Sequence, residues 1–284
     1  MRWTPGDRSN IEDRRGRSAR MGAVPMGIGG ILVLLVLSWF TGVDFLSLAG
    51  GGGAPPSSQV EAGPSAPPAD TTPDEERMVD LVDTVVADTQ ATWDQLMGGQ
   101  YQPTTAVIFR DATQSTCGFA QAAVGPFYCP ADRRIYLDLD FFNDLRTRFG
   151  APGEFAQAYV IAHEVGHHVQ TITGVERRVR QLQQSNPSDR NALSVLMELQ
   201  ADCYAGIWAR GAAQPGGRVD LEAGDIEDGL RAAAAIGDDT LQRRSGGRVM
   251  PDQFTHGSSE QRVSWFRRGF DTGDPNSCNT FERR

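Results

Sequence analysis

The stretch AYVIAHEVGHHVQ, residues 158–170, contains three of the four histidines in this 284-residue chain. The stretch is otherwise mostly apolar. Pro152 precedes it and Gly174 follows it, as is typical of the two ends of a helix. Residues four apart on a helix lie one turn apart on the same face, so His163 and His167 direct their imidazoles at one point. The stretch therefore predicts a buried helix that offers two metal ligands from one face.

Glu164 directly follows the first of these histidines and completes the pattern H-E-x-x-H. In this pattern the two histidines bind zinc, and the glutamate is the general base that takes a proton from a water on the metal. Zinc lowers the pKa of that water toward neutrality, which produces a nucleophile for a carbonyl carbon. His168 points about 100° away from His167 around the helix, which favours a supporting or packing role. The alternative is a core helix whose histidines have this spacing by chance.

A catalytic zinc site needs a third protein ligand and leaves a fourth position open. A third histidine six residues after the second is excluded, since Thr173 occupies that position. The later segment LMELQADCYAG instead carries Glu198 and, one turn on, Asp202 on the same face of a predicted helix. We expect Glu198 to be the third ligand and Asp202 to accept a hydrogen bond from a ligating histidine. The alternative is a solvated acidic face, although the neighbouring residues are mainly apolar.

The remainder of the chain after residue 73 combines long helical patterns with a few short apolar runs. The runs at 104–110 and 133–142 are typical of strands. Capping residues and apolar periodicity predict helices at 72–98, 140–149, 152–174, 186–211, 220–237 and 257–270. These elements indicate an α+β fold that is predominantly helical with a small β-sheet.

Residues 24–43 contain no charged side chain over about 20 positions, roughly the length that a helix needs to cross the hydrocarbon layer. We expect a transmembrane signal-anchor at 24–48, after a cytoplasmic arginine-rich N-terminus at 1–23. A flexible Gly/Pro-rich linker at 49–73 then leads to the functional domain at 74–284. This order predicts a single-pass protein of the cell membrane whose C-terminal domain is extracytoplasmic. The alternative is a cleaved signal peptide.

All four cysteines lie after the linker, and an even number on the exported side of a membrane favours two disulfides. We predict that Cys117 pairs with Cys129, because the two lie 12 residues apart across a hairpin-like connection. Cys203 and Cys278 are then partners by elimination. Free thiols would instead argue against the predicted topology.

Four segments together resemble a known family. They are AYVIAHEVGHHVQ, ELQADCYAGIWA, GPFYCPADRRIYLDLDFF and FTHGSSEQRVSWFRRGF. The chain is similar in these segments to the bacterial putative neutral zinc metallopeptidase family (YpfJ-like), and the resemblance includes the family's arginine-rich start and single membrane segment. The resemblance implies a zincin-like metalloprotease domain with His163, His167 and Glu198 as ligands of Zn2+ and Glu164 as the catalytic base. It also implies that His256, in the segment THG, helps to stabilise the oxyanion. The alternative for His256 is a helix-capping or surface role.

The leading hypothesis is thus a membrane-anchored zinc peptidase that acts on a protein or peptide substrate. A catalytically idle binding module on the same scaffold is the second hypothesis, and the presence of Glu164 argues against it, because binding alone needs no base. A purely structural zinc is disfavoured, because such sites are usually closed by four protein ligands. The net charge of −9 and the lack of a basic stripe argue against nucleic acid as a partner.

Overall fold

The computed structural model describes residues 1–16, 71–121, 125–214, 216–244, 246 and 248–282. The helices are α3 (Pro73–Leu96), α4 (Leu139–Thr147), α5 (Glu154–Ile172), α6 (Val175–Ser185), α7 (Arg190–Ala212), α8 (Asp225–Ala235), α9 (Asp238–Arg244) and α10 (Ser259–Thr272), with 3-10 turns η2 (Pro187–Asp189), η3 (Pro251–Gln253) and η4 (Pro275–Cys278). The strands are β1 (Arg2–Trp3), β2 (Ile11–Asp13), β3 (Thr105–Phe109), β4 (Ala112–Ser115), β5 (Gly118–Gln121), β6 (Phe127–Cys129), β7 (Arg134–Asp138) and β8 (Val219–Asp220). The expected combination of many helices with a small sheet is present.

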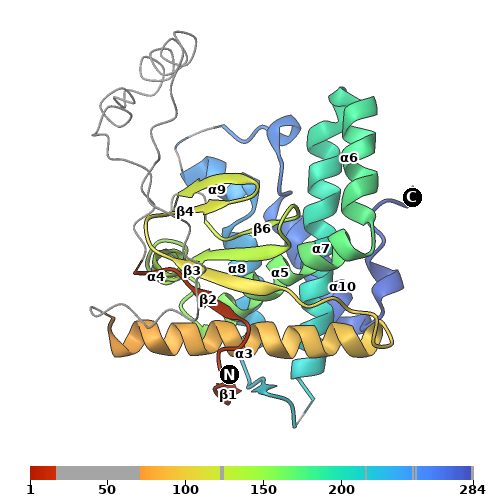
Figure 1. The fold of residues 1–284 in the computed structure, drawn as a ribbon. Helices are drawn as coiled ribbons and strands as arrows, with labels where there is room; N and C mark the ends of the chain where they lie inside the picture. The colour runs from red at the N-terminus through yellow and green to blue at the C-terminus, as the bar shows by residue number, and fades with distance from the viewer. Residues whose placement is uncertain (17–70, 122–124, 215, 245, 247, 283–284) are drawn as a thin grey trace, which may run out of the picture. The chain divides into compact units, whose positions relative to one another are not determined.

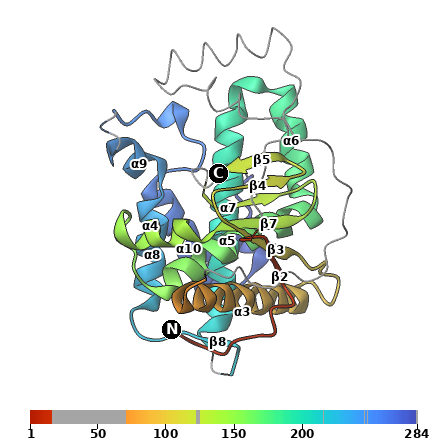
Figure 2. The ribbon, with the colours of Figure 1, turned by 60° about the vertical axis from the view of Figure 1, so that its left-hand side comes forward.

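The largest sheet has the strand order β2-β3-β7-β6, and α3 runs beneath it in both ribbon views (Figures 1 and 2). β2, β3 and β7 are parallel, whereas β6 pairs antiparallel with β7. Successive side chains of a strand point to opposite faces. Accordingly Ala106 and Ile108 join the main helical core, while Val107 and Phe109 form a smaller cluster on the other face. Both faces of the central strands are therefore buried.

Helix termini follow the capping residues in the sequence. Thr72 caps α3 and forms a reciprocal capping box with Glu75, and Ser258 does the same for α10 with Gln261. These side chains satisfy backbone N–H groups that have no partner within the helix. α10 continues past Gly269 and ends at Thr272, because Gly273 adopts the left-handed conformation that closes the helix.

Two close helix crossings bring the histidine helix and its partners together. A Cβ added at Gly166 of α5 would lie 3.1 Å from the Cα and carbonyl oxygen of Ala201, so α5 and α7 touch through their backbones there. A Cβ at Gly269 of α10 would overlap the carbonyl group of Cys203 on α7, so α10 lies equally close to α7. Glycine permits both approaches because it has no side chain. The contacts of α5 and α10 with α7 thus lie within one turn of α7, at Ala201 and Cys203.

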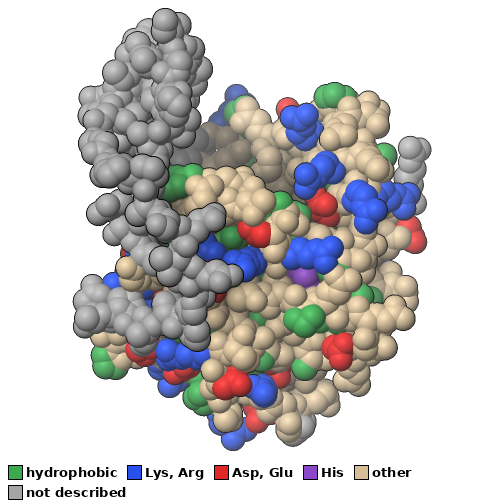
Figure 3. All heavy atoms as spheres, viewed as in Figure 1, with side chains coloured by type: hydrophobic (Ala, Val, Ile, Leu, Met, Phe, Trp, Pro, Cys, Tyr) green, Lys and Arg blue, Asp and Glu red, His purple; other side chains and the backbone are tan. Residues whose placement is uncertain are grey.

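The segment between α5 and α7, where the sequence patterns predict no helix, contains the amphipathic helix α6. Its Val179 is buried, whereas Arg177, Arg178 and Arg180 are exposed. Figure 3 shows arginine side chains gathered at the upper right, where α6 lies in Figure 1. The charged residues of this segment therefore form the solvated face of a helix.

The N-terminal residues contradict the predicted membrane topology. β1 pairs with β8, and β2 pairs with β3, so residues 1–16 belong to the same compact unit as the described residues after 70. A membrane cannot separate strands of one sheet. Among the described residues, no helix is both long and apolar enough to span a bilayer. The predictions of a transmembrane helix, a single-pass protein and a cytoplasmic N-terminus opposite an extracytoplasmic domain are therefore wrong, and residues 24–48 themselves lie outside the described residues.

Both predicted disulfides are confirmed. Cys117 is bonded to Cys129, with 5.8 Å between the Cα atoms, and Cys203 is bonded to Cys278, with 5.6 Å. No cysteine is free. The first bond ties the turn between β4 and β5 to the end of β6, and the second ties η4 to the middle of α7.

Candidate metal centre

Three side chains from α5 and α7 converge on one point. Nε2 of His163 lies 3.1 Å from one carboxylate oxygen of Glu198, and Nε2 of His167 lies 3.4 Å from the other. One ligand atom from each residue falls within 4.8 Å of the others. The crossing explains the convergence, because Gly166 lies between the two histidines on α5 and the touching Ala201 lies between Glu198 and Asp202 on α7.

The other nitrogen of each histidine contacts an oxygen acceptor. Nδ1 of His163 lies 2.9 Å from Oδ1 of Asp202, and Nδ1 of His167 lies 2.9 Å from Oε1 of Gln170. A carboxylate can only accept, so Nδ1 of His163 donates to Asp202. In the neutral imidazole, Nε2 then carries the lone pair that a metal would bind. This is the tautomer in which metal-ligating histidines are usually held.

Asp202 is itself held by Arg262 of α10, a residue that the sequence analysis missed. The Arg262 guanidinium donates to both carboxylate oxygens of Asp202 at 2.9 Å, and Tyr159 donates its hydroxyl to Oδ1 at 2.5 Å. Arg262 is only 2% exposed. Nothing in the sequence separates it from the exposed Arg267 and Arg268 of the same helix, because only the α7–α10 crossing brings it to Asp202.

Electrostatics at this site favour a bound cation. Burial alone would raise the pKa of Glu198, but His167 and His163 lower it well below its ordinary value. Burial would likewise raise the pKa of Asp202, but Arg262 and His163 lower it. Burial lowers the pKa of His163, but Asp202 and Glu198 more than offset that effect and raise it to about 10. The surrounding carboxylates therefore stabilise positive charge at the histidines, whether it comes from a proton or from a metal.

The residues present fit zinc. Two imidazole nitrogens and one carboxylate oxygen form a donor set typical of catalytic zinc sites. Three carboxylates, those of Glu164, Glu198 and Asp202, lie around the site against the single guanidinium of Arg262. When the three carboxylates are ionised and both histidines are neutral, these groups sum to two negative charges, which a divalent cation neutralises.

A cavity of about 890 Å³ opens over the metal-ligand group. His163, Glu164, His167 and Glu198 line it, and His256 lies on the same cavity wall from the loop before α10. Other parts of its wall are apolar and come mainly from aromatic and branched side chains. These include Phe127, Phe141, Phe149, Val160, Ile236 and Leu241. Burial raises the pKa of Glu164, with His167 and His163 acting against it.

His168 faces away from the metal-ligand group. Its Nε2 lies 2.5 Å from the backbone carbonyl oxygen of Gln102 and therefore donates, so its Nδ1 accepts from the hydroxyl of Tyr128 at 3.0 Å. Tyr128 belongs to β6 and lines the cavity. His168 thus connects the histidine helix to the edge strand of the sheet.

Comparisons with known proteins show which family the chain belongs to. A family profile described as "Putative neutral zinc metallopeptidase" matches residues 1–281. The chain is 48% identical to an Escherichia coli protein named "Uncharacterized protein YpfJ", over 99% of each chain. It is 46% identical to an uncharacterised protein of Mycobacterium tuberculosis, over 67% of this chain and 66% of that one. No solved structure matches. By the extent of these matches, the chain belongs to the putative neutral zinc metallopeptidase family.

Proposed function

We propose that this chain is a peptidase that hydrolyses peptide bonds of a protein or peptide substrate, with zinc held by His163, His167 and Glu198. The observation that carries the proposal is the convergence of these three donors beneath an open cavity that also contains Glu164. A bound zinc ion supplies Lewis acidity, which polarises the substrate carbonyl and lowers the pKa of the attacking water.

Protein side chains supply the general base, the groups that orient the histidines and the donor to the oxyanion. The Glu164 carboxylate takes the proton of the attacking water and delivers it to the leaving amine. Burial raises its pKa, which makes it a stronger base than an exposed glutamate. Asp202 and Gln170 orient the ligand histidines through Nδ1. His256 donates a hydrogen bond to the oxyanion that develops on the substrate carbonyl.

The test separates metal binding from chemistry. We expect Glu164→Gln to keep zinc and to lower kcat by about 10²-fold or more, because the amide has nearly the same shape and cannot take a proton. Replacing His163, His167 or Glu198 by Ala should remove most of the zinc together with the activity. Glu176→Gln is the matched control, since Glu176 lines the same cavity but bonds to Arg180 through its carboxylate.

Zinc content and cleavage of a broad peptide library are measured on the full chain. Wild-type kcat in Glu164→Gln would exclude the proposed base. Zinc binding without any cleavage by the wild-type chain would instead support a binding module.

A further inference from the structure

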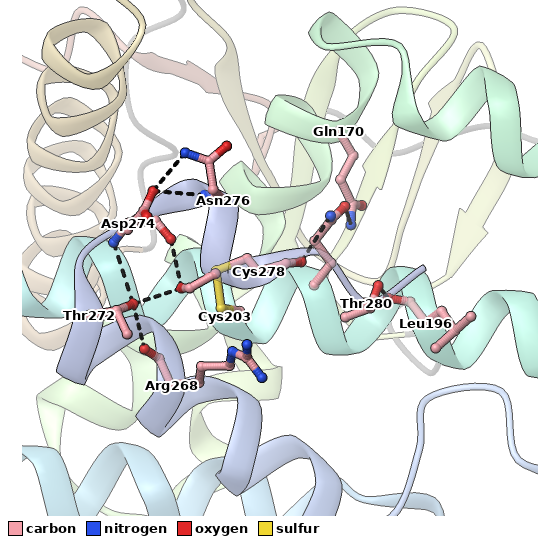
Figure 4. The surroundings of a disulfide bond; sticks show 11 residues. Gln170, Leu196, Cys203, Arg268, Thr272, Asp274, Asn276, Cys278 and Thr280 are labelled. Atoms are coloured by element: carbon pink, nitrogen blue, oxygen red, sulfur yellow. Dashed lines mark hydrogen bonds between the residues drawn. A yellow bond between two sulfur atoms is a disulfide. The ribbon is translucent and has the colours of Figure 1, made fainter. Parts of the chain in front are cut away.

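A chain of buried hydrogen bonds leads from His167 to the loop that contains the second disulfide. Oε1 of Gln170 faces Nδ1 of His167, and the Gln170 amide nitrogen donates to Oε1 of Gln200 at 3.1 Å. The Gln200 amide nitrogen in turn donates to the backbone carbonyl oxygen of Cys278 at 3.1 Å. Gln170 is 0% exposed and Gln200 is 4% exposed. In Figure 4 the Gln170 side chain points toward the segment that carries Cys278.

The backbone carbonyl of Cys278 determines which group donates in each of these hydrogen bonds. A backbone carbonyl oxygen can only accept, so Gln200 turns its NH2 group toward Cys278 and its oxygen toward Gln170. The NH2 group of Gln170 then donates to that oxygen and to the carbonyl oxygen of Met197, at 2.7 Å. Its oxygen is then the group that faces His167 and accepts a hydrogen bond from Nδ1, so in the neutral imidazole Nε2 carries the lone pair that faces Glu198.

We propose that Gln170 and Gln200 are positioning residues of the metal centre, which hold His167 in its metal-binding tautomer through a hydrogen-bond direction set by the Cys278 carbonyl. This inference rests on the proposed function, because it takes His167 as a zinc ligand. His163 does not depend on this chain, since its Nδ1 partner is Asp202, which Arg262 orients.

The anchor of the chain is built to stay in place. The disulfide joins Cys278 to Cys203, three residues after Gln200 on α7. On the far side of Cys278, the Thr280 hydroxyl donates to the carbonyl oxygen of Leu196 at 2.7 Å. Before it, Asp274 caps the turn that leads into η4 (Figure 4). The carbonyl that orients Gln200 is therefore fixed on the helix that also carries Glu198.

The experiment measures the zinc dissociation constant of the full chain by chelator competition. We expect Gln170→Leu to weaken zinc binding by about 10- to 100-fold, the usual effect of losing the partner of a ligating histidine. Gln200→Leu should weaken it less, and the double variant should be no weaker than Gln170→Leu alone, because Gln200 acts through Gln170. Gln183→Leu is the control, since that amide bonds only within the α6–α7 hairpin.

Gln170→Glu distinguishes positioning from packing. The carboxylate of Gln170→Glu still accepts a hydrogen bond from His167, so this variant should bind zinc more tightly than Gln170→Leu. The carboxylate cannot donate to Met197 or Gln200, so the fold of Gln170→Glu should be less stable than that of Gln170→Leu. If Gln170 served only the fold, zinc affinity and stability would fall in the same order.

If His167→Ala abolishes zinc binding but Gln170→Leu binds zinc with the wild-type affinity, the inference about Gln170 is wrong and the proposed ligand set stands. Wild-type affinity in His167→Ala overturns the proposed ligand set instead.

Discussion

At the scale of single residues, His256 is supported differently from the proposed ligands. Oδ2 of Asp238 accepts the backbone N–H groups of Thr255, His256 and Gly257 at 2.7, 2.7 and 3.0 Å, and Oδ1 lies 3.2 Å from Nδ1 of His256. The hydrogen bond to Asp238 raises the pKa of His256 above its ordinary value, although burial acts against it. Glu198 also raises that pKa and Arg262 lowers it. Asp238 therefore helps to position this imidazole and favours its protonated form.

The pH dependence of kcat should show the titration of His256 next to Asp238. Below its raised pKa, His256 carries a proton on both nitrogens, so Nε2 can donate to an oxyanion while Nδ1 faces Asp238. As pH rises through that pKa, the Nε2 proton is lost, because the Asp238 carboxylate keeps the other. We expect kcat to fall on the alkaline side with a midpoint above 6.5, the ordinary value for histidine. Asp238→Asn should move the midpoint down.

The pH profile of peptide hydrolysis measures this midpoint for both proteins. His256→Ala should keep its zinc and lower kcat by about 10²-fold near neutrality, as expected for one oxyanion donor. An unchanged alkaline limb in His256→Ala would assign that limb to another group and leave His256 as a surface residue.

At the scale of secondary-structure elements, the α5–α7 crossing sets the geometry of the site. We expect Gly166→Ala to weaken zinc binding by about 10-fold, because the added Cβ would lie 3.1 Å from the α7 backbone and would push Glu198 away from the histidines. Gly211→Ala on α7 is the matched control, since its Cβ would lie 3.6 Å from the Thr92 side chain. That change should leave zinc binding unaltered and slightly stabilise the fold, because alanine favours helix more than glycine.

Chelator competition and denaturant unfolding of the two alanine variants measure these effects. Equal zinc affinity in both variants would mean that α7 can shift without loss of the site.

The same crossing shows how far local sequence patterns reach. The spacings H-x-x-x-H and E-x-x-x-D identified the four residues that meet there, because helical periodicity predicts which side chains share a face. Gln200 and Arg262 carry no such signal, since their partners come from other parts of the fold. Gln170 lies three residues after His167 on the same helix, but the partners of its amide nitrogen are on α7. α6 was missed because charged residues dominate its exposed face. Long-range pairing of this kind is decided by packing and not by local spacing.

At the scale of the whole molecule, the N-terminal segment shows why charge and hydropathy misled the topology prediction. Arginines before an apolar run are typical of a cytoplasmic flank. Here Arg8 pairs with Glu76 and Asp80 of α3, at 2.6 and 2.7 Å, and Arg15 pairs with Glu76 at 2.8 Å. The buried carboxylate of Asp83 accepts from the backbone N–H groups of Arg8 and Asn10. These charges are partners of the acidic first half of α3, which no local pattern reveals.

If residues 1–16 are an integral part of the fold, Arg15→Met should cost about 1–3 kcal/mol of unfolding free energy. Arg15 is 5% exposed and bridges the partly buried carboxylates of Asp13 and Glu76, and its loss removes the charged hydrogen bonds to both, although Glu76 keeps its pairing with Arg8. Arg2→Met is the control. Its side chain is 74% exposed and its 3.3 Å contact with Glu222 lies at the surface, so the cost should stay within about 0.5 kcal/mol. Denaturant unfolding of both variants decides the matter, because a segment that formed no part of the core would leave both free energies unchanged.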